Sequence, residues 1–451
     1  MTESHRVTTL NAVMVWFLYN ILFVIGFALM LPRFLARMVR RGGYWKNFEQ
    51  RLARYGSDLQ SRLAQIQPIW IHAVSVGELF VAFKMIEQWR ARRPELRFVL
   101  STTTSTGYAL ASRRIHPEDV LIYFPLDLPP IVNRALTAIR PRALILVEIE
   151  LWPNLIRLAH GRAIPIALVN ARLSDRSFKG YRLLRFFSRR LLPMIDLFCA
   201  QTRMDADRLI ALGAPRHRIA VLGSAKYDVA SVDPASGSRA REILARAGIT
   251  ENHMILLGGS TWPGEEDALL DVYKSLKTRH RNLVLVLAPR HVERAEDIIR
   301  AIRSHALSFV RRSQLEAEVS RGAPQVFLLD TTGELKDLYA CADVIFIGKS
   351  LTQHGGQNPI EPAAFGKAIL CGPNMENFRG VVEDFRQADA IVQVNDLQSL
   401  RRVCSELLSN PQRRRMLGER AARVVAEKRG AIDHTIDLLE TLLENEPGDD
   451  L

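Results

Sequence analysis

Residues 342–365 read ADVIFIGKSLTQHGGQNPIEPAAF, a strand-to-helix turn in sequence form. The apolar run at 342–348 predicts a buried strand, and the run at 360–365 predicts a helix. The paired glycines Gly355 and Gly356 are expected to leave backbone N–H groups exposed, and a helix N-terminus adds partial positive charge. This turn is therefore predicted to bind an anion.

The polar residues of this turn have two possible roles. Glu361 lies one turn into the predicted helix, where a carboxylate can accept hydrogen bonds from sugar hydroxyls. Asn358 as N-cap, Pro359 at the first helical position and Glu361 three residues on also form a capping box. That second role is purely structural, and the stretch alone does not choose between them.

The rest of the chain repeats this alternation of strand and helix. Short runs rich in Val, Ile and Leu, separated by amphipathic stretches, are typical of parallel sheets covered on both faces. A Pro/Gly/Ser-rich break at 232–238 predicts a linker between two series of strands. The expected strands are 69–74, 98–101, 120–124, 143–147, 165–169 and 196–200, and then 254–258, 283–288, 326–329, 344–348, 368–371 and 391–394.

We therefore predict an α/β chain of two doubly wound, Rossmann-like domains that face each other across a cleft, preceded by a membrane-anchor helix. The predicted domains are 1–46 for the anchor and its basic flank, 47–231 for the first Rossmann-like domain and 239–443 for the second. Such folds bind ligands at the carboxyl ends of their strands, so residues that directly follow strands are candidate site residues.

Composition narrows the class of partner and compartment. A formal net charge of +13 over 451 residues suits nucleic acid, an anionic membrane surface or acidic substrates. The basic residues are scattered without interleaved aromatic residues, so no nucleic-acid partner is expected. The four cysteines show neither metal-ligand spacing nor a disulfide framework, which fits a reducing cytoplasm. No metal site is predicted, because Asp205 and Asp207 fit a helix start better than a ligand pair.

The N-terminal segment from Asn11 to Leu31 holds no charge and is about long enough to cross a bilayer once. Basic residues follow it from Arg33 to Lys46, and the positive-inside rule then places the rest of the chain in the cytoplasm. A cleavable signal peptide is disfavoured because the charged flank lies on the wrong side. A shallow interfacial helix has a similar pattern and stays an alternative. We expect a single N-terminal anchor in the inner (plasma) membrane, in contact with its lipid.

Acidic residues follow two strands of the first series. Glu78 lies where a strand gives way to a helix, and the helix N-terminus is expected to favour its ionised form. An ionised carboxylate there can take a proton from a hydroxyl, although a glutamate that stabilises the first helical turn fits as well. Glu148 and Glu150 follow the strand at 143–147. Burying two carboxylates together is costly unless donors or cationic ligands meet them, which favours a site.

Two turns of the second series are candidates for binding phosphate or carboxylate. Ser260 and Thr261 lie in the Gly-rich turn at 258–265, which is a weak signal by itself. Pro289 and Arg290 end the next strand. The guanidinium of Arg290 offers an always-charged donor fork, with an interdomain salt bridge as the ordinary alternative.

These segments, taken together and in order, resemble the Kdo transferases, which attach 3-deoxy-D-manno-octulosonic acid (Kdo) to the lipid A precursor. The resemblance covers nearly the whole chain. It is carried by HAVSVGE (72–78), STTTSTGY (101–108), YFPLDLP (123–129), VEIELWPN (147–154), VNARLSDRS (169–177), GSAKYD (223–228), APRH (288–291), DTTGEL (330–335), GGQNPIEP (355–362) and CGPNMENF (371–378).

The resemblance implies a two-domain GT-B glycosyltransferase on the inner face of the inner membrane, which uses CMP-Kdo and needs no cofactor or bound metal. It implies that Glu78 is the general base and Glu148 a second essential glutamate. One departure concerns the segment Gly348-Lys349-Ser350, where many members have Gly-Gly-Ser, so the role of Lys349 is open. The CMP-binding side is matched by Arg290, Gly356, Asn358 and Glu361, to which we add the neighbours Pro289, Lys349 and Gly355.

The expected reaction is an inverting transfer of Kdo from CMP-Kdo onto the lipid A precursor (lipid IVA) in lipopolysaccharide core biosynthesis. Glu78 takes the proton of an acceptor hydroxyl, which attacks the anomeric carbon of Kdo as CMP leaves. One arginine, a helix N-terminus and Gly N–H groups can neutralise the single phosphate of CMP. The alternatives are another GT-B enzyme that uses a UDP-sugar, a nucleotide-sugar epimerase, and a membrane-tethered binding protein.

Overall fold

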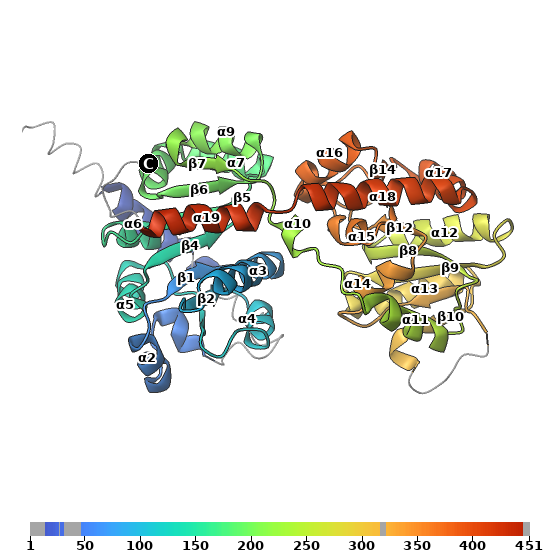
Figure 1. Cartoon of the computed structure of the whole chain (residues 1–451), viewed down its shortest axis with the longest axis horizontal. Helices are drawn as coiled ribbons and strands as arrows, with labels where there is room; N and C mark the ends of the chain where they lie inside the picture. The colour runs from blue at the N-terminus through green and yellow to red at the C-terminus, as the bar shows by residue number, and fades with distance from the viewer. Residues whose placement is uncertain (1–13, 27, 31–46, 316–321, 445–451) are drawn as a thin grey trace, which may run out of the picture. The chain divides into compact units, whose positions relative to one another are not determined.

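The computed structural model describes residues 14–26, 28–30, 47–315 and 322–444, and the chain divides into two compact units (Figure 1). The first unit contains the residues up to Val229 together with the last helix, α19 (Ala431–Glu444), and the second runs from Ala230 to Arg429. The sequence predicts a second domain over 239–443, but this end is wrong because α19 packs on the first unit. The predicted linker at 232–238 is also too long, since helix α11 begins at Ser236.

The first unit is built on a sheet of seven parallel strands in the order β3-β2-β1-β4-β5-β6-β7. The strand order reverses between β1 and β4, and every residue of both strands is buried. The strands are β1 Ile69–His72, β2 Phe98–Thr102, β3 Val120–Tyr123, β4 Ala143–Val147, β5 Ile166–Ala171, β6 Leu197–Ala200 and β7 Ile219–Val221. The α-helices are α2 Ser57–Ala64, α3 Val76–Arg92, α4 Ser105–Ser112, α5 Pro129–Ile139, α6 Pro153–His160, α7 Asp175–Leu183, α8 Arg185–Leu191, α9 Arg203–Leu212 and α10 Lys226–Val229, with 3-10 turns η1 Phe48–Leu52, η2 Leu192–Met194 and η3 Arg216–Arg218.

The second unit repeats this architecture with seven parallel strands in the order β10-β11-β9-β8-β12-β13-β14, which reverses between β8 and β12. The strands are β8 Met254–Thr261, β9 Leu283–Pro289, β10 Phe309–Arg311, β11 Val326–Leu328, β12 Val344–Ile347, β13 Ala368–Cys371 and β14 Val392–Gln393. The α-helices are α11 Ser236–Arg246, α12 Glu265–Lys277, α13 Ala295–Ser304, α14 Leu335–Leu338, α15 Ile360–Ala364, α16 Arg379–Gln387, α17 Leu397–Ser409 and α18 Pro411–Glu427, with 3-10 turns η4 Val292–Arg294, η5 Arg312–Gln314, η6 Tyr339–Cys341 and η7 Glu376–Phe378.

The sequence predicts the central strands of both sheets well. All the strands expected from apolar runs are present, and β4 and β13 have the predicted bounds. Two strands were missed, β7 and β10, and each is an edge strand of three residues that is not fully buried. An edge strand needs no long apolar run because only one side of it is paired, so the apolar pattern identified the edge strands β3 and β14 but not the short β7 and β10.

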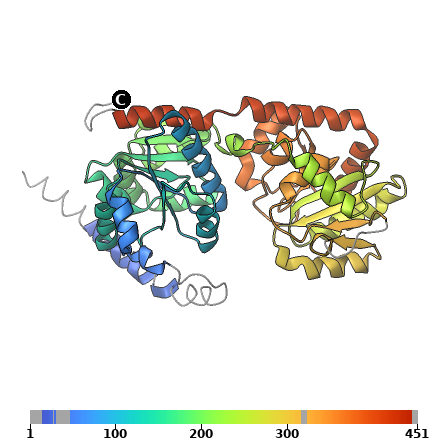
Figure 2. The ribbon, with the colours of Figure 1, turned by 60° about the horizontal axis from the view of Figure 1, so that its bottom comes forward.

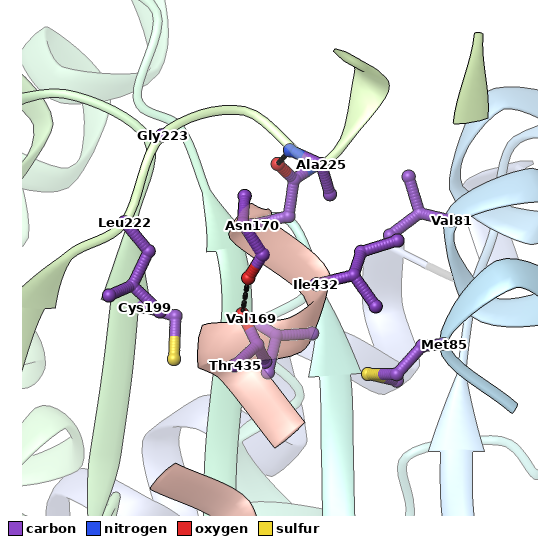
Figure 3. A pocket seen from close by; sticks show the side chains of 11 residues that line it. Val81, Met85, Val169, Asn170, Cys199, Leu222, Gly223, Ala225, Ile432 and Thr435 are labelled. Carbon is purple, nitrogen blue, oxygen red and sulfur yellow. Dashed lines mark hydrogen bonds between the residues drawn. The ribbon is translucent and has the colours of Figure 1, made fainter. Parts of the chain in front are cut away.

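The last helix, α19, lies against α3 and α10 of the first unit (Figure 2). The Arg92 guanidinium pairs with Asp433 at 2.9 Å and with Asp437 at 2.6 Å. The apolar side of α19 adds Ile432 and Ile436 to the core beneath β1 and β4. A cavity of about 10 Å³ remains under this helix (Figure 3), which is room for about one water molecule and not for a substrate.

The described N-terminal residues 14–26 are helical and are docked on the first unit. The Trp16 ring lies 5.3 Å from the ring of Phe187, and the Tyr19 hydroxyl donates to Asp127 at 2.8 Å. No helix in the described part of the chain is long and apolar enough to cross a membrane. The anchor predicted within 1–46 lies partly outside the described residues.

Candidate functional site

Two groups of polar side chains lie at the carboxyl ends of the two sheets, at the positions where each strand order reverses. In the first unit, Glu78 is in the first turn of α3, which follows β1, and Glu148 directly follows β4. Because β1 and β4 are hydrogen-bonded neighbours, the two carboxylates, which are seventy residues apart in the sequence, lie side by side at the carboxyl end of the sheet. This is the usual ligand position of a doubly wound sheet.

Glu78 is held in place by the backbone around it. Ser75 caps α3 by accepting from the Glu78 N–H at 3.2 Å, and the Glu78 carboxylate accepts from the Val74 N–H at 2.8 Å. The residue is only 6% exposed. Burial raises the pKa of Glu78 above its usual value, and the nearby charge of Glu148 acts in the same direction. The helix N-terminus was predicted to favour the ionised form, but the cost of desolvation is larger.

Glu148 and Glu150 complete an acidic cluster with Glu78. The Glu148 carboxylate pairs with Lys226 Nζ at 3.1 Å, and its backbone is left-handed with φ 61°. Burial raises the pKa of Glu150 to about 7, and the charges of Glu78 and Glu148 add to the rise, although a 3.1 Å hydrogen bond from Trp152 opposes it. The sequence already pointed to Glu150 as the partner of Glu148 in a candidate carboxylate pair, but it did not single out Lys226. The available signal for Lys226 was the segment GSAKYD at 223–228.

In the second unit a buried carboxylate ties together two turns beside the switch from β8 to β12. The Glu265 carboxylate accepts four backbone N–H groups, from Trp262, Lys349, Ser350 and Leu351, at 2.8–3.0 Å. These N–H groups are therefore not available to a ligand. Of the two residues predicted to bind phosphate or carboxylate in this turn, Thr261 is fully buried in β8, and Ser260, half-buried, has a left-handed backbone with φ 55°.

The glycine pair of the GGQNPIEP segment is also engaged within the chain. Gly355 has φ 117° and donates its N–H to the Glu376 carboxylate at 2.7 Å, and Gly356 has φ 70° and donates to the Lys349 carbonyl at 2.9 Å. The prediction that these two N–H groups are exposed for an anion is therefore wrong. Their glycines are explained by the left-handed backbone, which side chains disfavour.

The residues after the glycine pair begin the short helix α15. The predicted N-cap is one residue off, because the cap position is Pro359, but the Asn358 side chain still accepts from the Ile360 N–H at 3.0 Å. Asn358 also donates to the Glu361 carboxylate at 3.2 Å. Burial raises the pKa of Glu361, while Lys336 and the Asn358 hydrogen bond act against this. Both roles considered for Glu361 therefore remain compatible with its position.

Cationic side chains and aromatic rings lie together at the carboxyl end of the second sheet. Lys349 Nζ lies 4.6 Å from the centre of the Trp262 ring. The rings of His291 and Trp262 meet edge-on, with their centres 5.2 Å apart. Arg290 is exposed directly after Pro289, the last residue of β9. Because β9, β8 and β12 are consecutive in the sheet, Pro289, Arg290 and Lys349 all lie at its carboxyl end.

The described ranges contain no group of three His, Cys, Asp or Glu side chains that could hold a metal ion. The Asp-x-Asp sequence lies at the start of α9, as predicted, but Asp205 is buried, whereas solvent exposure was expected. Thr202 caps α9 by accepting from the Asp205 N–H at 3.2 Å, and the Asp205 carboxylate accepts from the Leu173 N–H at 2.8 Å. Asp207 points elsewhere and pairs with Arg203 at 3.6 Å.

Comparison with known proteins assigns the family. Residues 46–229 match the 3-deoxy-D-manno-octulosonic-acid transferase (kdotransferase) family, and residues 266–424 match the group 1 glycosyl transferases. The chain is 33% identical to the 3-deoxy-D-manno-octulosonic acid transferase of Haemophilus influenzae over 400 residues, which cover 88% of this chain and 92% of the relative. This chain belongs to the Kdo transferase family. A Kdo transferase of Bordetella pertussis is likewise 33% identical, over 93% of this chain and 97% of its own length.

Membership of the Kdo transferases confirms the resemblance drawn from the sequence segments, and with it the assignment as a glycosyltransferase. Solved structures establish the GT-B fold. The UDP-GlcNAc 2-epimerase of Neisseria meningitidis, 14% identical, matches with a TM-score of 0.58 over 84% of this chain and 100% of its own. Anabaena HepE, 13% identical, matches with a TM-score of 0.55 over 84% of this chain and 99% of its own. At such low identity these likenesses show the fold alone.

Proposed function

We propose that this Kdo transferase moves Kdo from CMP-Kdo onto a hydroxyl of the lipid A precursor with inversion at the anomeric carbon. The family assignment supports the transferred sugar. The observation that carries the mechanism is the carboxylate cluster at the switch point between β1 and β4, in which Glu78 is buried, backbone-held and raised in pKa.

Glu78 is the general base of this proposal. A general base works best when its pKa approaches the operating pH, and burial together with Glu148 moves Glu78 in that direction. The acceptor hydroxyl gives its proton to the Glu78 carboxylate while its oxygen forms a bond to the anomeric carbon. The bond from that carbon to the phosphate oxygen breaks, and its electron pair leaves with CMP. Glu148 is balanced by Lys226 and sets the charge around Glu78.

The donor is proposed to bind at the carboxyl edge of the second sheet. CMP-Kdo carries one phosphate and one sugar carboxylate, and Arg290 and Lys349 supply two cations at that edge. Gly355 and Gly356 shape the turn beside Lys349, since a side chain at Gly355 would come within 3.5 Å of the Lys349 Cε atom. Asn358 and Glu361 offer a polar pair to the sugar hydroxyls of CMP.

Attachment to the inner membrane, with both units on the cytoplasmic side, completes the proposal. The uncharged run from Asn11 to Leu31 and the basic residues after it support this placement. A membrane-bound enzyme also meets a lipid acceptor without extracting it from the bilayer.

The test is Glu78→Gln, which keeps shape but removes the base. Transfer from CMP-Kdo to lipid IVA, followed by mass analysis of the products, should fall about a hundredfold or more, while CMP should still protect the protein from thermal unfolding. The matched control is Glu87→Gln, an exposed glutamate of the same helix paired with Lys84. Transfer by the Glu78 variant near the parent rate would show that another group is the base. Protection by UDP and not by CMP would overturn the donor.

A further inference from the structure

The ion pair between Lys226 and Glu148 joins two segments that are far apart in the chain. Glu148 directly follows β4, and Lys226 begins α10 after the turn at 223–225. That turn follows β7, an edge strand whose residues are not fully buried. A lysine on such a segment keeps one position only if its backbone is held, because ordering a long side chain costs conformational entropy. The contacts that hold this turn therefore affect the charge beside Glu78.

Both partners of the ion pair are hydrogen-bonded to consecutive residues of β5. The Glu148 N–H donates to the Val169 carbonyl at 2.9 Å. The Ala225 N–H, directly before Lys226, donates to the side-chain Oδ1 of Asn170 at 3.1 Å (Figure 3). The end of β5 thus positions the segment that carries the carboxylate and the segment that carries the ammonium.

Asn170 lies at an irregular point of β5. Its backbone is left-handed with φ 52°, and the pairing of β5 with β6 shifts register between Leu168 and Ala171. Irregularities of this kind change the direction of a side chain and are common next to active sites. The Gln201 side chain donates to the Asn170 carbonyl at 2.9 Å, which holds the backbone at this point. The direction of the Asn170 side chain is therefore set by the strand end.

The backbone conformation alone does not explain an asparagine here. Asparagine is more often left-handed than most residues, but glycine accepts the same φ without strain. Asn170 is 4% exposed, and its Nδ2 atom has no hydrogen-bond partner within the described residues. A buried amide donor without a partner is costly, and glycine would not bury one. What asparagine adds is the acceptor for the Ala225 N–H.

We propose that Asn170 is a positioning residue of the transfer reaction: by accepting the Ala225 N–H, its side chain holds the segment 223–226 so that Lys226 stays paired with Glu148. Asn170 does not touch the reacting atoms. It acts through this segment, whose lysine supplies the positive charge at the carboxyl end of the first sheet.

Loss of this hydrogen bond has an electrostatic consequence at the general base. The consequence rests on the proposed function, in which Glu148, balanced by Lys226, sets the charge around Glu78. With Lys226 displaced, the carboxylates of Glu148 and Glu150 act on Glu78 without that cation. A more negative environment raises the pKa of a carboxyl, so Glu78 would ionise at higher pH. The acid limb of the pH profile of kcat/KM, which reports the base of the free enzyme, would move with it.

Amide exchange tests the hydrogen bond without any substrate. Asn170→Gly suits φ 52° and removes the acceptor, so exchange of the Ala225 N–H in the full chain, followed by mass spectrometry, should be about three- to tenfold faster. Asn170→Asp keeps an oxygen acceptor and should protect this N–H like the parent. The control is Thr435→Val, which alters the same cavity (Figure 3) but a hydroxyl that donates to the Ala431 carbonyl.

Two exchange results would overturn the proposal, whichever residue is the base. Unchanged exchange at Ala225 in Asn170→Gly would show that this hydrogen bond does not hold the segment. Faster exchange throughout the first unit would show that Asn170 serves folding as a whole.

Transfer kinetics test the consequence for the reaction. Asn170→Gly should lower kcat/KM about fivefold at neutral pH and move the acid limb up by about half a pH unit, whereas Thr435→Val should do neither. Lys226→Met removes the ammonium outright and should move the limb in the same direction. The double variant Asn170→Gly/Lys226→Met should be no slower than Lys226→Met, because both changes act through one ammonium.

The kinetic results also separate this proposal from the proposed function. Losses that multiply in the double variant would show that Asn170 acts independently of Lys226 and would overturn the proposal. A slower Asn170→Gly with an unmoved acid limb, in an enzyme whose limb Lys226→Met does move, would show a merely structural role. The exchange result and the double-variant comparison stand even if Glu78→Gln shows that another group is the base.

Discussion

Glu265 offers the sharpest test of how the second unit is held together. Its carboxylate accepts the N–H groups of Trp262, Lys349, Ser350 and Leu351, and the side chain is fully buried. It therefore joins the turn after β8 to the turn after β12, the two strands between which the order reverses. Replacement by alanine leaves four donors without this acceptor.

The magnitude follows from the kind of bond that is lost. A hydrogen bond to a charged group contributes about 1.5–3 kcal/mol, and an unsatisfied buried donor costs about 1–3 kcal/mol. Burial raises the pKa of Glu265, so part of the gain is offset by desolvation. Water that enters the alanine cavity can serve some donors. The net loss for Glu265→Ala is then about 3–5 kcal/mol, and for Glu265→Gln, which keeps one oxygen acceptor, about 1–2 kcal/mol.

Scanning calorimetry on the full chain measures this loss. In a domain of this size each kcal/mol lowers the midpoint by roughly 2–4 °C, so Glu265→Ala should lower the transition of the second unit by roughly 6–20 °C and reduce its protection by CMP. Glu293→Ala, an exposed glutamate of the same unit, is the control. A midpoint for Glu265→Ala within about 2 °C of the parent would refute the reasoning that this carboxylate holds the two turns together.

Three further predictions concern pH, the donor cation and backbone strain. The pKa of Glu150 is raised to about 7, so ionisation of this carboxyl destabilises the folded first unit: its contribution to stability is present at low pH and is lost as the pH rises from about 4.5 through 7. In unfolding scans between pH 5 and 8, Glu150→Gln should flatten this loss of stability by about 1–3 kcal/mol at pH 8. Lys349→Gly keeps a residue suited to φ 59° and removes the ammonium, so calorimetric titration should show CMP-Kdo bound roughly five- to thirtyfold more weakly with an unchanged melting point. Gly356→Ala would place a Cβ atom against Met375 Sδ at φ 70°, whereas Gly366→Ala at φ 65° meets nothing closer than 3.8 Å. Thermal unfolding should therefore show about 1 kcal/mol lost at Gly366 and about 2–4 at Gly356, and equal losses would mean that packing at Met375 is unimportant.

Local pattern was sufficient for the parts of the fold that are buried on both faces. The run at 143–147 gave β4 with its bounds because a central parallel strand must be apolar throughout. It could not give β7, an edge strand of three residues, nor the placement of α19 in the first unit, since both depend on contacts with residues far away in sequence. Packing decides these assignments, and packing is not periodic.

The residues of the candidate site are likewise of two kinds, those that a local pattern could identify and those that it could not. Glu78 and Glu148 could be selected because each follows a strand, and the topology then brought them together. The glycine pair was interpreted as an open anion site, because the local sequence does not show that the Glu376 carboxylate and the Lys349 carbonyl accept its N–H groups. Glu265 was likewise missed as an acceptor of four N–H groups. Hydrogen-bond partners that are set by the folding of the turns cannot be read from a local motif.

The return of α19 to the first unit makes the second unit an insertion. Ile432 and Ile436 fill the core beside Met85, and Arg92 binds two carboxylates of α19, so this core is incomplete until residues near 436 have been synthesised. The inserted unit, Ala230–Arg429, contains all seven strands of its own sheet. The core of the amino-terminal unit therefore depends on a segment that is synthesised after the whole of the second unit.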